Sequence, residues 1–179
     1  MRYKKSEFSN SVIKDRIEVI ENSKHILRFR TFLEKGGGQN QLHYHTKINE
    51  TFKVVQGELS VVLNKKESIL KAGSSYTIPA STAHMFYNNS NEQVIFDVEI
   101  LNPQKMIHGL KIMYGLANEG KINKEGLPKN IFYLTIALHM MDTFSPRIPY
   151  FIQKSGILIL ASLGKVLGIE KRLIEKYSV

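Results

Sequence analysis

Four residues of types that bind transition metals recur at spacings that a β-sheet could bring together. His43 and His45 are two positions apart, and Glu50 follows five residues later. On a strand, side chains at positions i and i+2 project from the same face, so the two imidazoles would point the same way. A turn of about four residues folds Glu50 back beside them on the next strand. His84 adds a third imidazole from a non-adjacent strand.

This set of donors indicates a metal site. Three neutral nitrogens and one carboxylate suit one divalent transition metal ion, such as iron, nickel, manganese, zinc or cobalt, and leave coordination positions open. The chain has no cysteine, which excludes thiolate ligands, disulfides and a cysteine nucleophile. The alternative interpretation of His43 and His45 is a pair of exposed polar residues on an ordinary strand.

Residues 12–101 alternate short strand patterns with turn compositions. Apolar and polar residues alternate at 26–32 and 92–101, and two β-rich runs within 51–64 fold about Gln56 and Gly57. Between these runs lie EKGGGQN, NKKES, KAGSS and NNSNE, which are turn compositions. The expected fold class is therefore mainly β, an antiparallel sandwich or barrel.

The pattern changes to helical spacing after Pro103. Met106, Leu110 and Met113 recur at helical intervals within 104–120, and two further apolar segments occupy 131–141 and 150–179. A polar linker at 121–130 and a loop at 144–149 separate them, so we expect three or four helices. Charged residues leave apolar stretches of about a dozen residues or fewer, whereas a membrane span needs about 20. We expect these helices to pack on the barrel or to form a dimer interface, with peripheral membrane contact as the lesser alternative.

The candidate ligands lie within two longer motifs. Residues 37–57 follow the pattern Gly37-x5-His43-x-His45-x4-Glu50-x6-Gly57, and residues 73–88 follow Gly73-x5-Pro79-x-Ser81-x2-His84-x3-Asn88. Over about residues 25–101 the chain resembles the cupin superfamily, and it departs from these motifs only at Ser81, where glycine is usual. Positive φ is expected at Gly57 and Gly73, because both occupy tight turns.

The resemblance has implications for the fold and for the site. It implies a small single-domain cupin with a jelly-roll β-barrel at residues 1–103, followed by a C-terminal α-helical extension at residues 104–179. It also implies that one metal ion lies near the centre of the barrel, bound by the residues that match the family's ligands. These are His43, His45, Glu50 and His84.

Strand alternation indicates which residues form the pocket beside the metal. If Glu50 and His84 point inward, every second residue on their strands does so as well. The expected substrate pocket is mostly apolar and aromatic, with a few polar groups. Its predicted residues are Gln41, Phe52, Val54, Tyr76 and Phe86. Core packing without a substrate role is the alternative for each of them.

Charge and motifs exclude several classes of function. The formal net charge is +9, and residues 102–179 hold 11 Lys and Arg against 5 Asp and Glu, a net charge of +6. We expect a lysine-rich solvated surface, because no helix-turn-helix, zinc-finger or RNA-recognition signature favours nucleic acid binding. No P-loop, dinucleotide fingerprint or nucleophile–base–acid triad is present. The first ten residues lack the apolar core of a secretory signal, so we expect a cytoplasmic protein.

The predicted site favours one reaction class and leaves two alternatives. An iron or nickel centre beside an apolar, aromatic pocket suits a dioxygenase-like enzyme acting on a small molecule, with Glu50 as both ligand and proton acceptor. A zinc or manganese centre suits an isomerase or lyase instead. The third interpretation is a non-catalytic, small-ligand-binding or regulatory cupin. A homodimer is expected, because an exposed apolar helical segment is an aggregation liability for a monomer.

Overall fold

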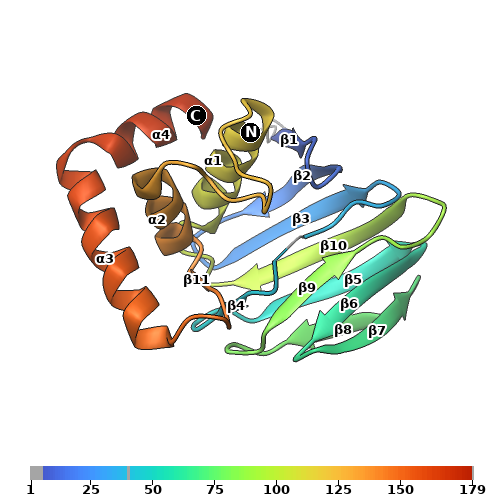
Figure 1. Cartoon of the computed structure of the whole chain (residues 1–179). Coiled ribbons are helices and arrows are strands. Elements are labelled where there is room, and N and C mark those ends of the chain that lie inside the picture. The colour runs from blue at the N-terminus through green and yellow to red at the C-terminus, as the bar shows by residue number, and fades with distance from the viewer. Residues whose placement is uncertain (1–5, 40, 179) are drawn as a thin grey trace.

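The computed structural model describes residues 6–39 and 41–178, which form a β domain followed by a helical part (Figure 1). The strands of the β domain are β1 (Glu7–Asn10), β2 (Asp15–Asn22), β3 (Ile26–Leu33), β4 (Tyr44–His45), β5 (Glu50–Gln56), β6 (Glu58–Leu63), β7 (Lys66–Lys71), β8 (Ser75–Ile78), β9 (His84–Tyr87) and β10 (Val94–Leu101). The helical part contains α1 (Met106–Asn118), α2 (Ile131–Met140), the short strand β11 (Thr143–Phe144), α3 (Tyr150–Val166) and α4 (Ile169–Tyr177). The expected order, strands followed by helices, is confirmed.

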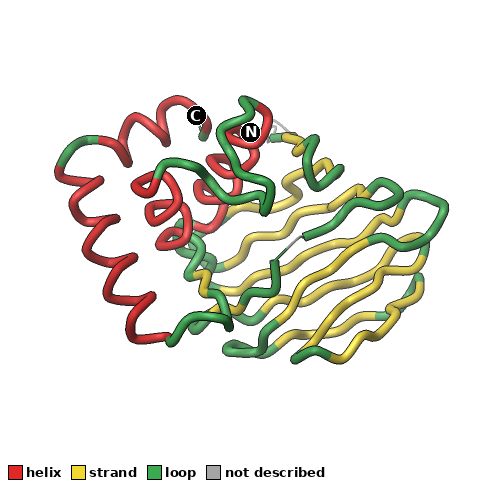
Figure 2. Tube along the Cα trace, viewed as in Figure 1, coloured by secondary structure: helices red, strands yellow, loops and turns green. Residues whose placement is uncertain are grey.

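The strands form two antiparallel layers (Figure 2). One sheet has the order β1-β2-β3-β10-β5-β8, and the other has the order β7-β6-β9. A bridge between His43 and His84 places β4 beside β9, and β11 pairs with β4. Hydrogen bonds among the described strands do not close the layers into one barrel, so the arrangement is a two-layered jelly roll.

The core of the β domain lies between the two layers. Every second residue of β3 and β10 is buried, as the alternation of apolar and polar residues predicts. The rings of Phe52, Phe86 and Phe96 contact one another edge to face, with centroids 5.1–5.7 Å apart. Such ring pairs contribute about 0.5–1.5 kcal/mol beyond the area they bury. This cluster fixes β5 and β9, the strands that carry Glu50 and His84.

Three tight turns hold residues in the left-handed region of backbone space. Gly57 and Gly73 have φ values of 82° and 86°, which confirms the expectation for both turns. Ser81 has a φ of 65°, so the turn keeps its left-handed geometry although serine replaces the usual glycine. The Ser81 backbone N–H donates to the carbonyl of His45 at 2.6 Å. The substitution therefore leaves the turn tied to β4 and adds backbone strain.

Replacing Ser81 with glycine is expected to raise the free energy of unfolding by about 0.5–1 kcal/mol, because glycine adopts positive φ without a Cβ clash. Urea denaturation measures the change. Ser81→Ala is the matched control: it also removes the hydroxyl but keeps the Cβ, so it should give no gain. Equal stabilisation by both substitutions would show that the strain at this turn is not the cause.

The helices gather on one side of the β domain, with α2 packed against α1, α3 and α4 (Figure 1). α3 approaches α2 closely at Gly164, where an added Cβ would lie 2.8 Å from Ile136. The pairing of β11 with β4, which the sequence did not predict, joins the helical part to the strand of His45. Among the described helices, none combines the length and hydropathy needed to cross a membrane.

Candidate metal centre

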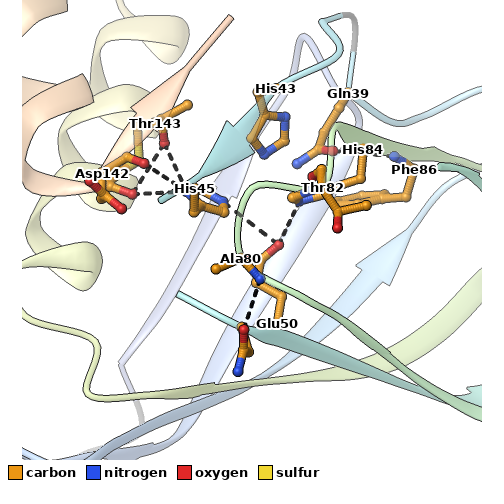
Figure 3. A network of polar contacts seen from close by, with 12 residues as sticks. Gln39, His43, His45, Glu50, Ala80, Thr82, His84, Phe86, Asp142 and Thr143 are labelled. Carbon is orange, nitrogen blue, oxygen red and sulfur yellow. Dashed lines mark hydrogen bonds and ion pairs between the residues drawn. The ribbon is translucent and has the colours of Figure 1, made fainter. Parts of the chain in front are cut away.

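The structure brings the four predicted ligands together from three parts of the chain. His45 lies in β4, preceded by His43, while Glu50 begins β5 and His84 begins β9. One ligand atom from each residue lies within 4.8 Å of the corresponding atoms of the other three. Figure 3 shows the three imidazoles and Glu50 grouped within the β domain, with Asp142 and Thr143 beside His45. The arrangement has the donor types and the spacing of a metal site.

Backbone carbonyls orient all three imidazoles. The contacts are His43 Nδ1 to Gln41 O at 3.3 Å, His45 Nδ1 to Met141 O at 3.0 Å and His84 Nδ1 to Thr82 O at 2.8 Å. A carbonyl oxygen only accepts, so each Nδ1 carries the proton and donates. Each Nε2 is thereby left to face the centre of the cluster, which is the tautomer that metal-binding histidines use.

The most direct evidence of fit is a buried nitrogen without a partner. Nε2 of His45 is buried and has no hydrogen-bond partner among the described residues. It lies 3.8 Å from Oε2 of Glu50, too far for a hydrogen bond. A buried polar atom left unpaired costs about 1–3 kcal/mol, and a cation between these two atoms would remove that cost. The cluster is compatible with a metal ion, and its donors suit iron, nickel, manganese and zinc alike.

The protonation states also suit a cation. Burial, together with the neighbouring His45 and His84, lowers the pKa of His43 to about 3, so this imidazole is neutral. Burial raises the pKa of Glu50, but the hydrogen bond from His84 and the nearby imidazoles outweigh it and hold the pKa at about 2. Burial lowers the pKa of His84, as it lowers that of His43. The Glu50 carboxylate, 2.8 Å away, outweighs this effect, so the pKa of His84 is raised overall. Nε2 of His84 donates to the carboxylate of Glu50, so a metal ion that binds this nitrogen would displace a proton.

The helical part holds one of these ligands in place. Asp142, two residues after α2, accepts hydrogen bonds from the backbone N–H groups of Thr46 at 2.7 Å and Lys47 at 2.8 Å. The carbonyls of Met141 and Asp142 both lie within hydrogen-bond reach of His45 Nδ1. Figure 3 shows Asp142 beside this imidazole. Nothing near His45 in the sequence points to these partners, because they lie almost a hundred residues away.

A cavity of about 380 Å³ adjoins the cluster and is lined by His43, His45 and Glu50. Three of the predicted pocket residues, Gln41, Phe52 and Phe86, line it. The helical part supplies much of the remaining wall, which sequence reasoning did not predict. These helical-part residues include Met106, Leu110, Met113, Leu134, Leu138 and Phe144.

The two other predicted pocket residues, Val54 and Tyr76, are not among the described residues that line this cavity. Val54 is 1% exposed and packs in the core, two positions further along β5 than Phe52. Tyr76 is 41% exposed, because β8 is the edge strand of its sheet. Alternation identifies the face on which a side chain lies but not its depth in the fold.

A second polar group lies in the cavity wall. The carboxyl of Asp15, at the start of β2, accepts a hydrogen bond from the hydroxyl of Tyr114 in α1, and both residues line the cavity. The other carboxyl oxygen, Oδ1, is buried and has no partner among the described residues. Burial raises the pKa of Asp15 to about 7, although the hydrogen bond from Tyr114 lowers it. Sequence reasoning missed this pair, because neither residue belongs to a motif.

Asp15 should make stability depend on pH. Its pKa is about 7 when folded and about 3.8 when unfolded, so between these values only the folded state keeps the proton. The Asp15 contribution to the free energy of unfolding is therefore fully present below about pH 4 and falls as pH rises towards 7. Asp15→Asn should remove this slope, a difference on the order of 2–4 kcal/mol between pH 4 and pH 8. Denaturation at several pH values measures it; equal slopes in both proteins would contradict the assignment.

A family model described as the cupin domain matches residues 29–101, which include all four residues of the cluster. The chain carries a cupin domain. Its C-terminal helices lie outside the matched residues. No protein with curated annotation matches the chain.

Solved structures agree with this fold. A sugar phosphate isomerase of the cupin superfamily from Silicibacter pomeroyi is 19% identical, with 55% of this chain and 71% of that chain covered and a TM-score of 0.51. An RmlC-like cupin from Shewanella frigidimarina is 16% identical, with 57% and 87% of the two chains covered and a TM-score of 0.49. At 19% identity, the similarity to the Silicibacter protein shows the fold and not the reaction.

Proposed function

We propose that the cupin domain is a metal-dependent, dioxygenase-like enzyme acting on a small apolar or aromatic molecule. The observation that carries the proposal is the composition of the cavity. It adjoins the cluster of histidines and Glu50, its other walls are mainly apolar, and no lysine or arginine within residues 6–39 and 41–178 lines it. Its volume of about 380 Å³ lies within the range of ligand sites.

The apolar lining restricts the class of substrate. Phe29, Phe52 and Phe86 from the β domain face methionine and leucine side chains from the helices. A phosphorylated sugar requires cationic side chains, yet the charged residues of this lining are Asp15, Glu50 and Glu125. We therefore do not propose a sugar phosphate, the substrate in the name of the Silicibacter protein, as the substrate of this chain. We infer that the substrate is an uncharged or weakly polar ring or chain, with one oxygen-containing group that reaches the cluster.

The residues of the site have distinct roles in this proposal. His43, His45, His84 and Glu50 would hold the metal ion, which when bound would supply open coordination positions for substrate and dioxygen. The lowered pKa of Glu50 keeps its carboxylate ionised, so one oxygen can ligate while the other accepts a proton from a substrate hydroxyl. Phe52 and Phe86 orient an apolar ring, and Gln41 offers an amide to a polar substituent.

One structural observation favours a second candidate, a non-catalytic cupin that binds a small ligand. Side chains of α1 and α2 form part of the cavity wall, so a bound ligand would touch both the β domain and the helices. Ligand binding could therefore be passed to the helical part without turnover. An isomerase or lyase, the remaining alternative, would use the same site as the dioxygenase-like enzyme but would need no dioxygen.

The experiment that separates these candidates combines turnover with oxygen uptake. Protein reconstituted separately with Fe(II), Ni(II), Mn(II) and Zn(II) is incubated with a panel of phenols, catechols and β-diketones, and the products are identified by mass spectrometry. Oxygen uptake with Fe(II) or Ni(II), abolished by His84→Ala, is the expected result. Product formation without oxygen uptake would favour an isomerase or lyase. Saturable binding without turnover for every metal would favour the binding protein.

A cytoplasmic homodimer is a further part of the proposal. The dimer would pair through the sheets of the β domain, so that the cavity of each subunit stays intact. Sedimentation velocity tests the assembly, because one chain has a mass of 20.5 kDa. A species of about twice that mass is expected. A monodisperse species near 20.5 kDa would contradict the dimer.

A further inference from the structure

We propose that the outer face of α3, together with a basic groove beside it, binds the surface of a membrane that contains anionic phospholipid. This surface is separate from the cavity of the proposed enzyme and does not depend on its reaction. The proposal combines an exposed apolar face, a cluster of unpaired lysines at its edge and the absence of acidic residues from the helix.

The apolar face of α3 is formed by seven large side chains that are about half exposed or more. They are Phe151 (79%), Ile152 (67%), Leu158 (50%), Ile159 (59%), Leu163 (48%), Val166 (84%) and the adjoining Leu167 (59%). Their spacing places them opposite Ile157, Ala161 and Gly164, the buried residues that pack α3 onto the molecule. Figure 1 shows α3 at the edge of the molecule, with no element outside it.

This face exceeds what a monomer usually leaves in water. Seven large apolar side chains, each at least 48% exposed, lie along one side of a single helix, whereas soluble monomers normally expose such side chains singly. Ser155 and Ser162 are the exposed polar residues among them, and neither carries a charge. A partner must therefore offer apolar contact along most of the helix, which at 17 residues is about 25 Å long.

A basic groove adjoins the apolar face. It has a volume of about 570 Å³, and four lysines, Lys47, Lys105, Lys154 and Lys165, line it against two carboxylates, Asp142 and Glu170. Lys105 pairs with Glu170, but within residues 6–39 and 41–178 the other three lysines form no ion pair. Leu158 belongs to both the groove and the apolar face, so the two surfaces are continuous. An anionic headgroup would reach the lysines while its acyl chain lay against α3.

Charge distinguishes a lipid surface from a second copy of the chain. α3 contains Lys154 and Lys165 but no acidic residue, so two α3 helices pressed together would place like charges near each other. The chain carries a net charge of +9. Self-association through its more basic half would bring these like charges together, and the two copies would repel each other. An anionic bilayer instead attracts it, at about 1 kcal/mol for each lysine near the surface.

The fold also explains how α3 would lie on the bilayer. Its buried side stays packed on the molecule, so only the opposite side can enter the lipid. A helix held in this way lies parallel to the membrane plane, with its apolar side chains about 5–10 Å into the boundary between headgroups and acyl chains. The lysines at its edge remain at the headgroup level.

Vesicle co-sedimentation of the full chain tests the proposal. The probes are vesicles of phosphatidylcholine alone and vesicles that contain about 30% phosphatidylserine, in about 0.1 M salt. We expect binding to the anionic vesicles and little binding to the neutral ones. Lys154→Glu/Lys165→Glu should weaken binding by about 30-fold or more, since removing two lysines alone accounts for that factor. Phe151→Ser/Val166→Ser, at the two most exposed side chains, should weaken it by at least about tenfold.

A matched control separates this surface from a general effect of charge. Lys24→Glu/Lys66→Glu makes the same change in net charge at two exposed lysines of the β domain, and it should leave binding within about twofold. Equal loss with this control, or equal binding to both kinds of vesicle, would overturn the proposal. A dimer that Phe151→Ser/Val166→Ser converts to a monomer, without vesicle binding, would assign the face to a second copy instead. Circular dichroism confirms that each variant is folded.

Discussion

Replacing His84 with alanine is expected to lower the affinity for a divalent metal ion by more than about 100-fold. His84 supplies one of the four candidate donors, and the contact between its Nδ1 and the carbonyl of Thr82 leaves Nε2 facing the cluster. Loss of groups that merely orient a ligand costs about 10–100-fold, and loss of the ligand itself should cost more. Competition with a chelator of known affinity measures the effect.

The matched control for this substitution is His25→Ala. His25 is exposed and lies outside the cluster, so its removal should leave metal affinity unchanged. His84→Ala also removes the hydrogen bond to Glu50, which leaves a buried carboxylate less well paired. The variant should therefore be less stable, and its folding is checked by thermal denaturation before the affinity is compared. Unchanged affinity in folded His84→Ala would remove His84 from the ligand set.

Asp142→Ala is expected to lower metal affinity by about 10–100-fold, although Asp142 is not a ligand. Its carboxylate accepts from the backbone of Thr46 and Lys47, directly after His45, and thereby keeps β4 against β11. Without it, the loop after His45 loses its anchor and the imidazole loses its fixed orientation. Isothermal titration with Zn(II) and Mn(II) measures the change.

Asp142→Asn tests the reason for that loss. The backbone N–H groups of Thr46 and Lys47 both donate to Oδ2, so an asparagine amide oxygen in its place can still accept them, though without the negative charge. This variant should therefore recover part of the affinity. A purely structural defect would lower the thermal stability of both variants without this graded effect on affinity. Identical affinities for the wild type and Asp142→Ala would show that the helical part does not position His45.

The sequence predicted that His43, His45, Glu50 and His84 would converge, because this geometry follows from local rules. Two residues two positions apart on a strand share a face, and the fixed spacings of both motifs place Glu50 and His84 at the starts of their own strands. The left-handed turns followed in the same way from Gly57 and Gly73. The change from strand to helix after Pro103 was visible as a change of period.

Contacts between distant segments were not predictable from one sequence. Asp142 could be placed in a loop, but nothing in the chain indicates that it would anchor the strand of His45. The helical wall of the cavity and the Asp15–Tyr114 pair depend in the same way on tertiary packing. Val54 and Tyr76 show a further limit. Alternation predicts the face of the sheet on which a side chain lies, but it does not predict that Val54 lies in the core and Tyr76 at the sheet edge.

The central claim is that the four-residue cluster holds a divalent metal ion. Its most direct test is the metal content, measured by plasma mass spectrometry, of untagged protein purified without added metal, with His43→Ala/His45→Ala purified in parallel. We expect close to one equivalent of iron, nickel, manganese or zinc in the wild type and nearly none in the double variant. A wild type that contains no metal and takes up none on reconstitution would contradict the claim.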